Sequence, residues 1–399
     1  MIHMPYIGKG GTSLGINFGT SATIIRKAKF ASYIAIFDRV TYLDCDENGT
    51  PEQFPVLNDY YNRTDVENFS LIPGSPITAY YASSNVFECF KKNRFVSDIA
   101  IPASGTSTGD NDSYLRLWYE VSFKKVNFQA KNRTVPNNRW FPCNKGGAYR
   151  RWAGGGEYVI DWENDGYRVK NCPKAYLRNI GSIFKSGLTW SKLGSGTFSM
   201  RYFPEGYICE SIGCCLFKKS EDLLLVLGLM NGVVTAKLMG IINPSMGRQP
   251  GYIGAVPYLV SSDKKVQIHN IVESNISLST SDWDSFETSW DFSQHPLVLL
   301  KEGAGYGTDM SKWNYTVSSA YRNWEIACSE RFKQLKANEE ELNRIFIDIY
   351  GLQDELKPEV ADDDVTVRLA DKKRDIRSLI SYAVGCMFGR YSLDAEGLA

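Results

Sequence analysis

Residues 139–156, RWFPCNKGGAYRRWAGGG, concentrate side chains that can hold a phosphate or a nucleic-acid base. The stretch contains two tryptophans, four arginines or lysines, five glycines and no acidic residue. Cations attract phosphates, aromatic rings stack on bases, and glycines allow a loop backbone to approach a groove closely. Three interpretations therefore compete: a nucleotide-phosphate site, a nucleic-acid contact, or a charged hairpin that binds nothing.

The order of the glycines argues against a nucleotide-phosphate loop. The stretch lacks the GxxxxGK[ST] pattern, because no Ser or Thr follows Lys145. A second glycine-rich stretch, GKGGTSLGINFG at residues 8–19, lacks the GxGxxG order. It also lacks the strand-to-helix context that would aim backbone N–H groups at a phosphate. We therefore expect no ATP or dinucleotide site.

The cysteines and histidines do not have metal-binding spacing. The three histidines, His3, His269 and His295, have no partner at ligand spacing, and the nine cysteines form no CxxC pair. An odd, scattered set of cysteines is typical of reduced cytosolic thiols. The adjacent Cys214 and Cys215 lie in an apolar, strand-like run, which predicts buried packing. We therefore expect no bound metal and a cytoplasmic protein.

A polar cluster at Asp110, Asn111 and Asp112 has two interpretations. Carboxylates can bind Mg²⁺, so Asp110 and Asp112 could serve an autonomous Mg²⁺-dependent nuclease. However, the residue patterns of such nucleases are not evident here. An Asx-type turn that leads into a strand is the favoured interpretation.

Adenine methylation would need two features that this sequence does not contain. One is a glycine turn for S-adenosylmethionine after a first strand. The other is a D/N-P-P-Y/F/W loop, which stacks a flipped base on its aromatic ring. The nearest match, HMPY at residues 3–6, lacks both the Asn or Asp and the first proline. We therefore assign no catalytic and no cofactor-binding residue to this chain.

The net charge of zero conceals an uneven distribution of charge along the chain. Residues 1–90 carry a net charge of −3, and residues 271–399 carry −9. Between them, residues 91–270 hold 25 Lys or Arg against 13 Asp or Glu, a net charge of +12. A basic block of this size favours a polyanionic partner, and its interleaved Trp and Tyr residues favour nucleic acid.

Basic and aromatic residues in predicted loops of this block are the candidates for contact with double-stranded DNA. Cations there would neutralise phosphates or read guanine edges, and a tryptophan would act as a wedge or stacking group. The candidates are Lys145, Arg150, Arg151, Trp152, Lys192 and Arg201.

The elements that must position these residues belong to a mixed α/β (α+β) fold. Strand-like segments such as EYVIDW and FSMRYF alternate with glycine clusters in the basic block, which a long helical run at 221–244 closes. In the acidic region, residues 317–350 have helical spacing, and a final helix is predicted over 367–388. These last two helices are expected to form an antiparallel pair.

No membrane association is expected. The N-terminus has no apolar run behind a basic start, so it does not look like a secretory signal. The most apolar segment, 223–242, contains Asn231 and Lys237 and is flanked by charge. We interpret it as a buried helix rather than a membrane span.

Taken together, the segments of the chain resemble one family. Those in the first part are LIPGSPITAYY, TGDNDSYLRLWYEV, RWFPCNKGGAYRRW, EYVIDWENDGY, GLTWSKLGSGTFSMRYFPEG and LLLVLGLMNG. Those in the tail are WDSFETSWDF, RFKQLKANEEELNRIFIDIYGLQDEL and DIRSLISYAVGCMFGRYSLD. From about residue 15 to the end, the chain looks like the C-terminal part of BREX phage-exclusion adenine-specific DNA methyltransferases of the PglX-like type. More distantly, LGLMNG followed by GRQPGYIGAVPYLV is similar to target-recognition domains of restriction–modification specificity subunits.

The resemblance implies a division into four parts. Residues 1–42 would be the last strands of a truncated methyltransferase catalytic domain, and 43–85 a linker. Residues 86–270 would be the target-recognition domain, which binds DNA, and 271–399 an acidic, mostly helical C-terminal region. The family's S-adenosylmethionine-binding glycines and NPPY loop have no matching positions here, so autonomous activity is not expected.

The resulting hypothesis is a DNA-recognition portion of an N6-adenine methyltransferase in phage defence. Its expected partners are double-stranded DNA and an upstream methyltransferase half or other BREX proteins. Two alternatives stay open. One is a structural or interaction protein that works through its helical tail, and the other is the nuclease described above.

Overall fold

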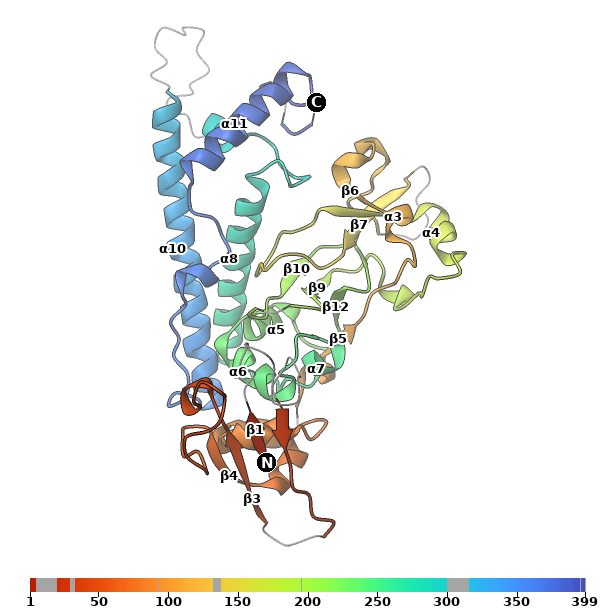
Figure 1. The fold of residues 1–399 in the computed structure, drawn as a ribbon. Coiled ribbons are helices and arrows are strands. Elements are labelled where there is room, and N and C mark those ends of the chain that lie inside the picture. Colours follow the sequence, from red (N-terminus) through yellow and green to blue (C-terminus); the bar gives the residue numbers. More distant parts are fainter. Residues whose placement is uncertain are drawn as a thin grey trace. The chain divides into compact units, whose positions relative to one another are not determined.

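The chain forms two compact units, a smaller one of Met1–Arg94 with Leu238–Pro244 and a larger one of Phe95–Lys237 with Ser245–Ala399 (Figure 1). The computed structural model describes residues 1–4, 20–28, 33–92, 94–131, 138–194, 196–299, 316–394 and 396–398. The glycine-rich stretch at 8–19 lies outside the described residues. The larger unit contains most of the predicted recognition domain together with the predicted helical region. The functional boundaries at 42, 85 and 270 stay predictions.

The smaller unit is built on a four-stranded sheet of order β2-β1-β3-β4. Its strands are β1 (Ile2–Met4), β2 (Thr20–Ala22), β3 (Ile34–Arg39) and β4 (Tyr61–Asp65). Phe37 of β3 stacks on Tyr80, with ring centroids 4.8 Å apart, and both side chains are buried. Helix α1 (Ser84–Lys91) follows, and the hydroxyl of Ser83 caps it by accepting the Val86 N–H.

The larger unit contains two more four-stranded sheets, of order β10-β9-β12-β5 and β11-β7-β8-β6. The strands of the first are β5 (Ala100–Ala103), β9 (Gly187–Ser191), β10 (Arg201–Phe203) and β12 (Gly213–Lys218). The strands of the second are β6 (Leu115–Leu117), β7 (Trp140–Asn144), β8 (Tyr158–Asp161) and β11 (Ile208–Cys209). Neighbouring strands are antiparallel except β11 and β7, which are parallel. The predicted mixed α/β class is therefore confirmed.

The longest helices form the C-terminal part of the larger unit (Figure 1). The α-helices are α2 (Val96–Ile99), α3 (Asn111–Tyr114), α4 (Glu163–Lys170), α5 (Leu223–Met230), α6 (Val233–Ile242), α7 (Pro250–Gly254), α8 (Lys265–Asp284), α9 (Pro296–Leu299), α10 (Val317–Tyr350) and α11 (Lys372–Met387). The 3₁₀ helices of the larger unit are Trp118–Glu120, Phe123–Lys125, Ile180–Ser182 and Asp362–Asp364. Those of the smaller unit are Tyr42–Asp44, Val66–Leu71 and Ile77–Tyr81. Helix α6 contributes residues to both units.

The helical predictions are partly confirmed. Helix α10 spans the predicted 317–350, but the predicted run at 221–244 is two helices, α5 and α6, bent by 77°. The break falls at Asn231, whose side chain accepts the Met200 N–H at 2.8 Å and donates to the Met200 carbonyl at 3.0 Å. The following Gly232 supplies no side chain that would favour helix continuation.

Helix α8 was not predicted, although it is the long neighbour of α10 (Figure 1). Asn338 of α10 donates to Asn275 of α8 at 2.8 Å. The final helix meets α10 through the Trp324 indole, which donates to Asp375 at 2.9 Å. The main partner of α10 is therefore α8, and not the final helix as the sequence suggested.

No single helix in the described ranges has the length and apolarity needed to cross a membrane. Helices α5 and α6 meet that criterion only together, across their bend. Most of their side chains are buried in the protein.

The expectation that all the cysteines are reduced is wrong for two of them. Cys209 and Cys215 form a disulfide, while Cys214 is buried as a free thiol. Strands β11 and β12 follow each other closely, which brings the two sulfur atoms together across six sequence positions. A pair of cysteines six positions apart is not a recognised disulfide motif, so the sequence did not predict this bond.

Candidate nucleic-acid interface

The loop between β7 and β8 carries the residues from which the DNA-binding prediction was made. Its glycines adopt left-handed conformations at Gly146 (φ 82°), Gly154 (φ 88°) and Gly155 (φ 82°), which glycine tolerates best. Trp152 also has a positive φ of 70°. These turns fold residues 150–153 back onto helices α8 and α10 instead of letting them project outwards.

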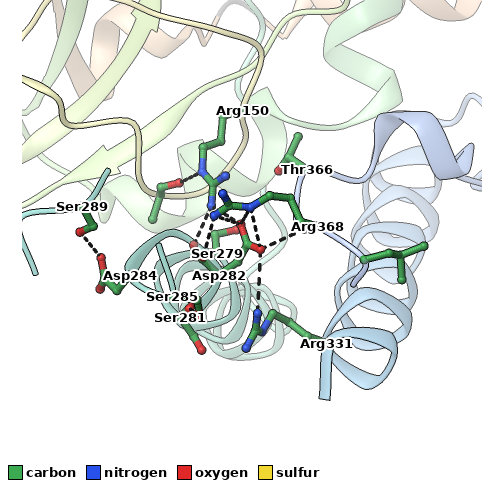
Figure 2. A network of polar contacts seen from close by, with 12 residues as sticks. Arg150, Ser279, Ser281, Asp282, Asp284, Ser285, Ser289, Arg331, Thr366 and Arg368 are labelled. Carbon is green, nitrogen blue, oxygen red and sulfur yellow. Dashed lines mark hydrogen bonds and ion pairs between the residues drawn. The ribbon is translucent and has the colours of Figure 1, made fainter. Parts of the chain in front are cut away.

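Arg150 is buried in an ionic network centred on Asp282 of α8 (Figure 2). Its guanidinium donates to the Asp282 carboxylate at 3.0 Å and to the Ser279 carbonyl at 2.8 Å. Arg368 donates to the same carboxylate at 3.1 Å, and Arg331 lies 3.9 Å from it. Burial alone would raise the pKa of Asp282, but the Arg368 and Arg150 guanidiniums hold it below its usual range.

Arg151 and Trp152 both bind Glu339 of α10. The Arg151 guanidinium donates to one carboxylate oxygen at 2.8 Å, and the Trp152 indole donates to the other at 2.6 Å. Glu339 is 3% exposed and Trp152 is 1% exposed. Both side chains from the loop therefore satisfy a carboxylate that would otherwise be buried without a partner.

Arg201 of β10 is also buried, next to the same loop. Its guanidinium donates to the Gly146 carbonyl at 3.3 Å and lies against Gly155, where an added Cβ would clash with it. Burial lowers the pKa of Arg201 to about 10, so the side chain remains charged at neutral pH. Arg201 therefore stabilises the fold of the β7–β8 loop through this hydrogen bond.

Four of the six predicted DNA-contacting residues are therefore internal in this structure. Arg150, Arg151, Trp152 and Arg201 are at most 8% exposed, so little of these side chains is available to a phosphate or a base. The sequence did not reveal that Arg150 and Arg151 point inwards, because their acidic partners lie more than 130 residues further along the chain. DNA contact stays a prediction for all six residues, of which Lys145 and Lys192 are the two that this structure leaves partly exposed.

Lys145 and Lys192 are partly exposed and lie on adjacent loops. The Ser191 hydroxyl donates to the Gly147 carbonyl at 2.9 Å, which joins the loop after β9 to the loop after β7. The Lys145 ammonium lies 4.5 Å from the centre of the Tyr158 ring. The Lys192 N–H donates to the Ile212 carbonyl at 2.8 Å.

Arg248 contacts the loop of Lys192 and was not among the residues predicted from the sequence. Its N–H donates to the Lys192 carbonyl at 2.7 Å, and Leu193 pairs with Gly247 in an antiparallel bridge. Its guanidinium packs 5.5 Å from the Phe198 ring centre and donates to the Gly196 carbonyl. The sequence shows Arg248 only as a single arginine in a Gly/Pro-rich turn after a helix, and this pattern does not indicate a DNA contact.

We call this region the basic loop surface. Its exposed apolar and aromatic side chains are Tyr149 (39% exposed), Leu193 (63%), Ile212 (41%) and Met246 (64%). Its cations are Lys145, Lys192 and Arg248. Cations beside exposed rings and aliphatic groups are the combination that meets phosphates and bases together.

The alternative nuclease site does not assemble around Asp110. The Asp110 carboxylate caps α3, accepting the Ser113 N–H at 3.1 Å and the Ser113 hydroxyl at 2.7 Å. These hydrogen bonds lower the pKa of Asp110. Within the described ranges, no group of three or more His, Cys, Asp or Glu side chains is placed to hold a metal ion. The observed cap is the favoured Asx-type arrangement.

Two known proteins are similar to this chain over 95% of its length. The chain is 39% identical over 395 residues to the adenine-specific methyltransferase PglX of Lacticaseibacillus casei (strain Zhang). It is 30% identical over 403 residues to the adenine-specific methyltransferase BrxX of Escherichia coli O9:H4 (strain HS). The chain spans about a third of the length of these relatives, 32% and 31% respectively. No family model matches it.

Proposed function

We propose that this chain is the DNA sequence-recognition portion of an adenine-specific methyltransferase in phage defence, because it is similar over 95% of its length to the PglX and BrxX enzymes. The observation that carries this proposal is the basic loop surface. There, hydrogen bonds join the three loops that carry Lys145, Lys192 and Arg248, beside exposed apolar side chains. The intact enzyme would transfer a methyl group to adenine, while this portion grips and reads the flanking duplex.

The position of these loops supports a role in reading DNA. They connect short strands and helices that are held by the buried cores of the larger unit. Loops on a rigid scaffold are common recognition surfaces. The buried arginines would serve recognition indirectly, because Arg150 and Arg151 fix the loop that carries Lys145 and Tyr149 to α8 and α10.

No residue of this chain is proposed to bind S-adenosylmethionine. The sequence lacks the family's cofactor and NPPY motifs, and the glycine-rich stretch at 8–19 lies outside the described residues. Methyl transfer is therefore proposed to depend on parts of the relatives that this chain does not match. Its protein partners would be a methyltransferase half and other proteins of the defence system.

A second candidate function, protein docking through the helical region, is favoured by the outer face of α11. Ile380, Val384, Met387 and Phe388 follow helical spacing and are 59%, 45%, 82% and 85% exposed. An exposed apolar stripe of this kind is typical of an interaction site. Partner co-purification that persists after nuclease treatment, and is lost with Phe388→Glu, would support this function.

DNA binding is tested with the basic-loop variant, in which Lys145, Lys192 and Arg248 are all changed to alanine. Its affinity for a fluorescently labelled duplex should be measured by anisotropy at low salt. We expect a loss of at least about tenfold, since each phosphate contact contributes counterion release.

The matched control removes three exposed cations from the helical region instead, by changing Lys333, Lys373 and Arg377 to alanine. This helical control variant has the same net charge as the basic-loop variant but an intact basic loop surface. It should bind DNA like the unmodified chain. Equal losses in the two variants would show that only net charge matters, and the proposed interface would be wrong.

A further inference from the structure

A cavity of about 620 Å³ in the larger unit has no part in the proposed DNA contact. It lies between the β9–β10 region and the C-terminal half of α8. Its walls include the aromatic side chains of Phe128, Tyr202, Tyr207, Trp283 and Trp290. A space of this size accommodates a small organic ligand.

The aromatic walls form a connected group. The ring centre of Trp290 lies 5.0 Å from that of Phe128 and 6.0 Å from that of Tyr207. The end of the glycine-rich stretch makes this possible, since a Cβ on Gly156 would lie 2.7 Å from the Trp290 ring. A Cβ on Gly154 would lie 2.9 Å from Trp283. The absence of side chains at Gly154 and Gly156 therefore leaves room for Trp283 and Trp290 in the cavity wall.

The charged groups around the cavity are mainly acidic. Asp284, Asp291 and Glu205 line it, against one lysine, Lys131. Burial raises the pKa of Asp284 and that of Asp291, and the Ser289 hydroxyl donates to the Asp284 carboxylate at 2.6 Å. Aromatic faces and carboxylates both attract cations, whereas this combination repels a phosphate backbone.

A second cavity of about 690 Å³ continues from the first along α8. The two share Ser186, Tyr202, Ile276, Thr280 and Asp284 in their walls. The second adds the carboxylates of Asp222 and Glu273, beside one cation, Lys218, and His269 contacts both of these acids at 2.6 and 3.2 Å. Glu273 and Asp284 are separated by about 16 Å along the helix axis.

We propose that the two cavities form one groove that binds an elongated organic polycation. The shared chemistry of the ligand is a series of alkylammonium groups on a flexible chain, either a free polyamine or the lysine side chains of a protein segment. Ammonium groups would pair with Asp284 and Asp291, and the connecting methylenes would pack on Tyr202 and Trp290. This inference does not depend on the proposed DNA contact, because the two surfaces share no residue.

Isothermal titration calorimetry on the full 399-residue chain tests the proposal with two probes, spermidine and a decapeptide of alternating lysine and glycine. Saturable binding of either probe is expected. The double variant Asp284→Asn, Asp291→Asn should weaken it about tenfold or more, through the loss of two charge-assisted contacts. Asp363→Asn is the control, because Asp363 is exposed and lies outside both cavities. It should bind like the unmodified chain.

A second variant tests the site without removing any carboxylate. Ile276→Lys places an ammonium group in the wall that both cavities share, and it should weaken the binding of the probes comparably.

Tighter binding of spermidine would identify a free polyamine, and tighter binding of the peptide would identify a protein segment. The proposal is overturned if neither probe binds, if both variants bind like the unmodified chain, or if Asp363→Asn is as weak as the double variant.

Discussion

At the scale of single residues, the charges of this chain act largely on each other. The Asp282 carboxylate forms ion pairs with Arg150, Arg331 and Arg368 (Figure 2). A buried ion pair adds little net stability by itself, but removing one partner leaves the others charged and uncompensated. The arginines expected on DNA are therefore better regarded as structural ties between the β7–β8 loop and α8.

Replacing Asp282 by alanine should lower the free energy of unfolding of the larger unit by about 3–5 kcal/mol. The reason is that Arg150 and Arg368 would stay buried without their carboxylate. Urea denaturation followed by circular dichroism measures this change. Asp363→Ala, at an exposed position, should change the free energy of unfolding by less than about 0.5 kcal/mol. A loss below about 1 kcal/mol for Asp282→Ala would contradict the network's assigned role.

His295 makes a pH-dependent contribution to stability. Its imidazole is 3% exposed, and its Nδ1 accepts the Leu297 N–H at 3.2 Å. Burial lowers the pKa of His295 from 6.5 to about 4, with the Asp375 charge opposing the shift. The unfolded chain therefore binds the proton more readily. The stabilising contribution is complete above pH 6.5 and is lost as the pH falls towards 4.

The size of this contribution follows from the difference between the two pKa values. The loss amounts to about 3 kcal/mol between neutral pH and pH 4. His295→Gln cannot take up the proton, so its free energy of unfolding should fall less steeply between pH 7 and pH 4.5. Parallel urea titrations across that range compare the two proteins. Identical pH slopes would show that His295 is not held neutral by burial.

At the scale of elements, α8 shows why parts of the fold escaped prediction. Its buried face carries Asn275, Ser279 and Asp282 as well as Ile268 and Val272. Hydrophobic periodicity therefore gives only a weak helical signal there. Helix α10 was predicted to its full length because its buried face repeats apolar residues. The sequence pattern joined α5 and α6, since the polar Asn231 between two apolar runs does not reveal that its partner is the backbone of Met200.

The break between α5 and α6 depends on the Asn231 side chain. Asn231→Ala removes two hydrogen bonds and leaves the Met200 N–H unpaired in a buried place, while the Met200 carbonyl still accepts the Trp152 N–H at 3.1 Å. We expect a loss of about 1–3 kcal/mol in the free energy of unfolding. Asn270→Ala is the matched change on the exposed face of α8 and should be near neutral. Equal stabilities of the two variants, measured by urea denaturation, would refute this explanation of the break.

At the scale of the whole molecule, the sequence predicted the mixed α/β class and the family resemblance but not which cations face outwards. The basic block and the acidic region meet inside the larger unit, where Arg150 and Arg151 neutralise carboxylates of α8 and α10. Net charge along a sequence does not record such internal pairing. Only Lys145 and Lys192 of the six candidates stayed accessible, and Arg248 was added by backbone pairing that no local pattern encodes.

The salt dependence of DNA binding tests the central claim most directly. The logarithm of the affinity for a duplex should be plotted against the logarithm of the salt concentration for the unmodified chain and both triple variants. Each lost phosphate contact reduces the slope by about 0.9, so the basic-loop variant should lose about 2 to 3 units of slope. The helical control variant should keep the slope of the unmodified chain. An unchanged slope in the basic-loop variant would contradict the account.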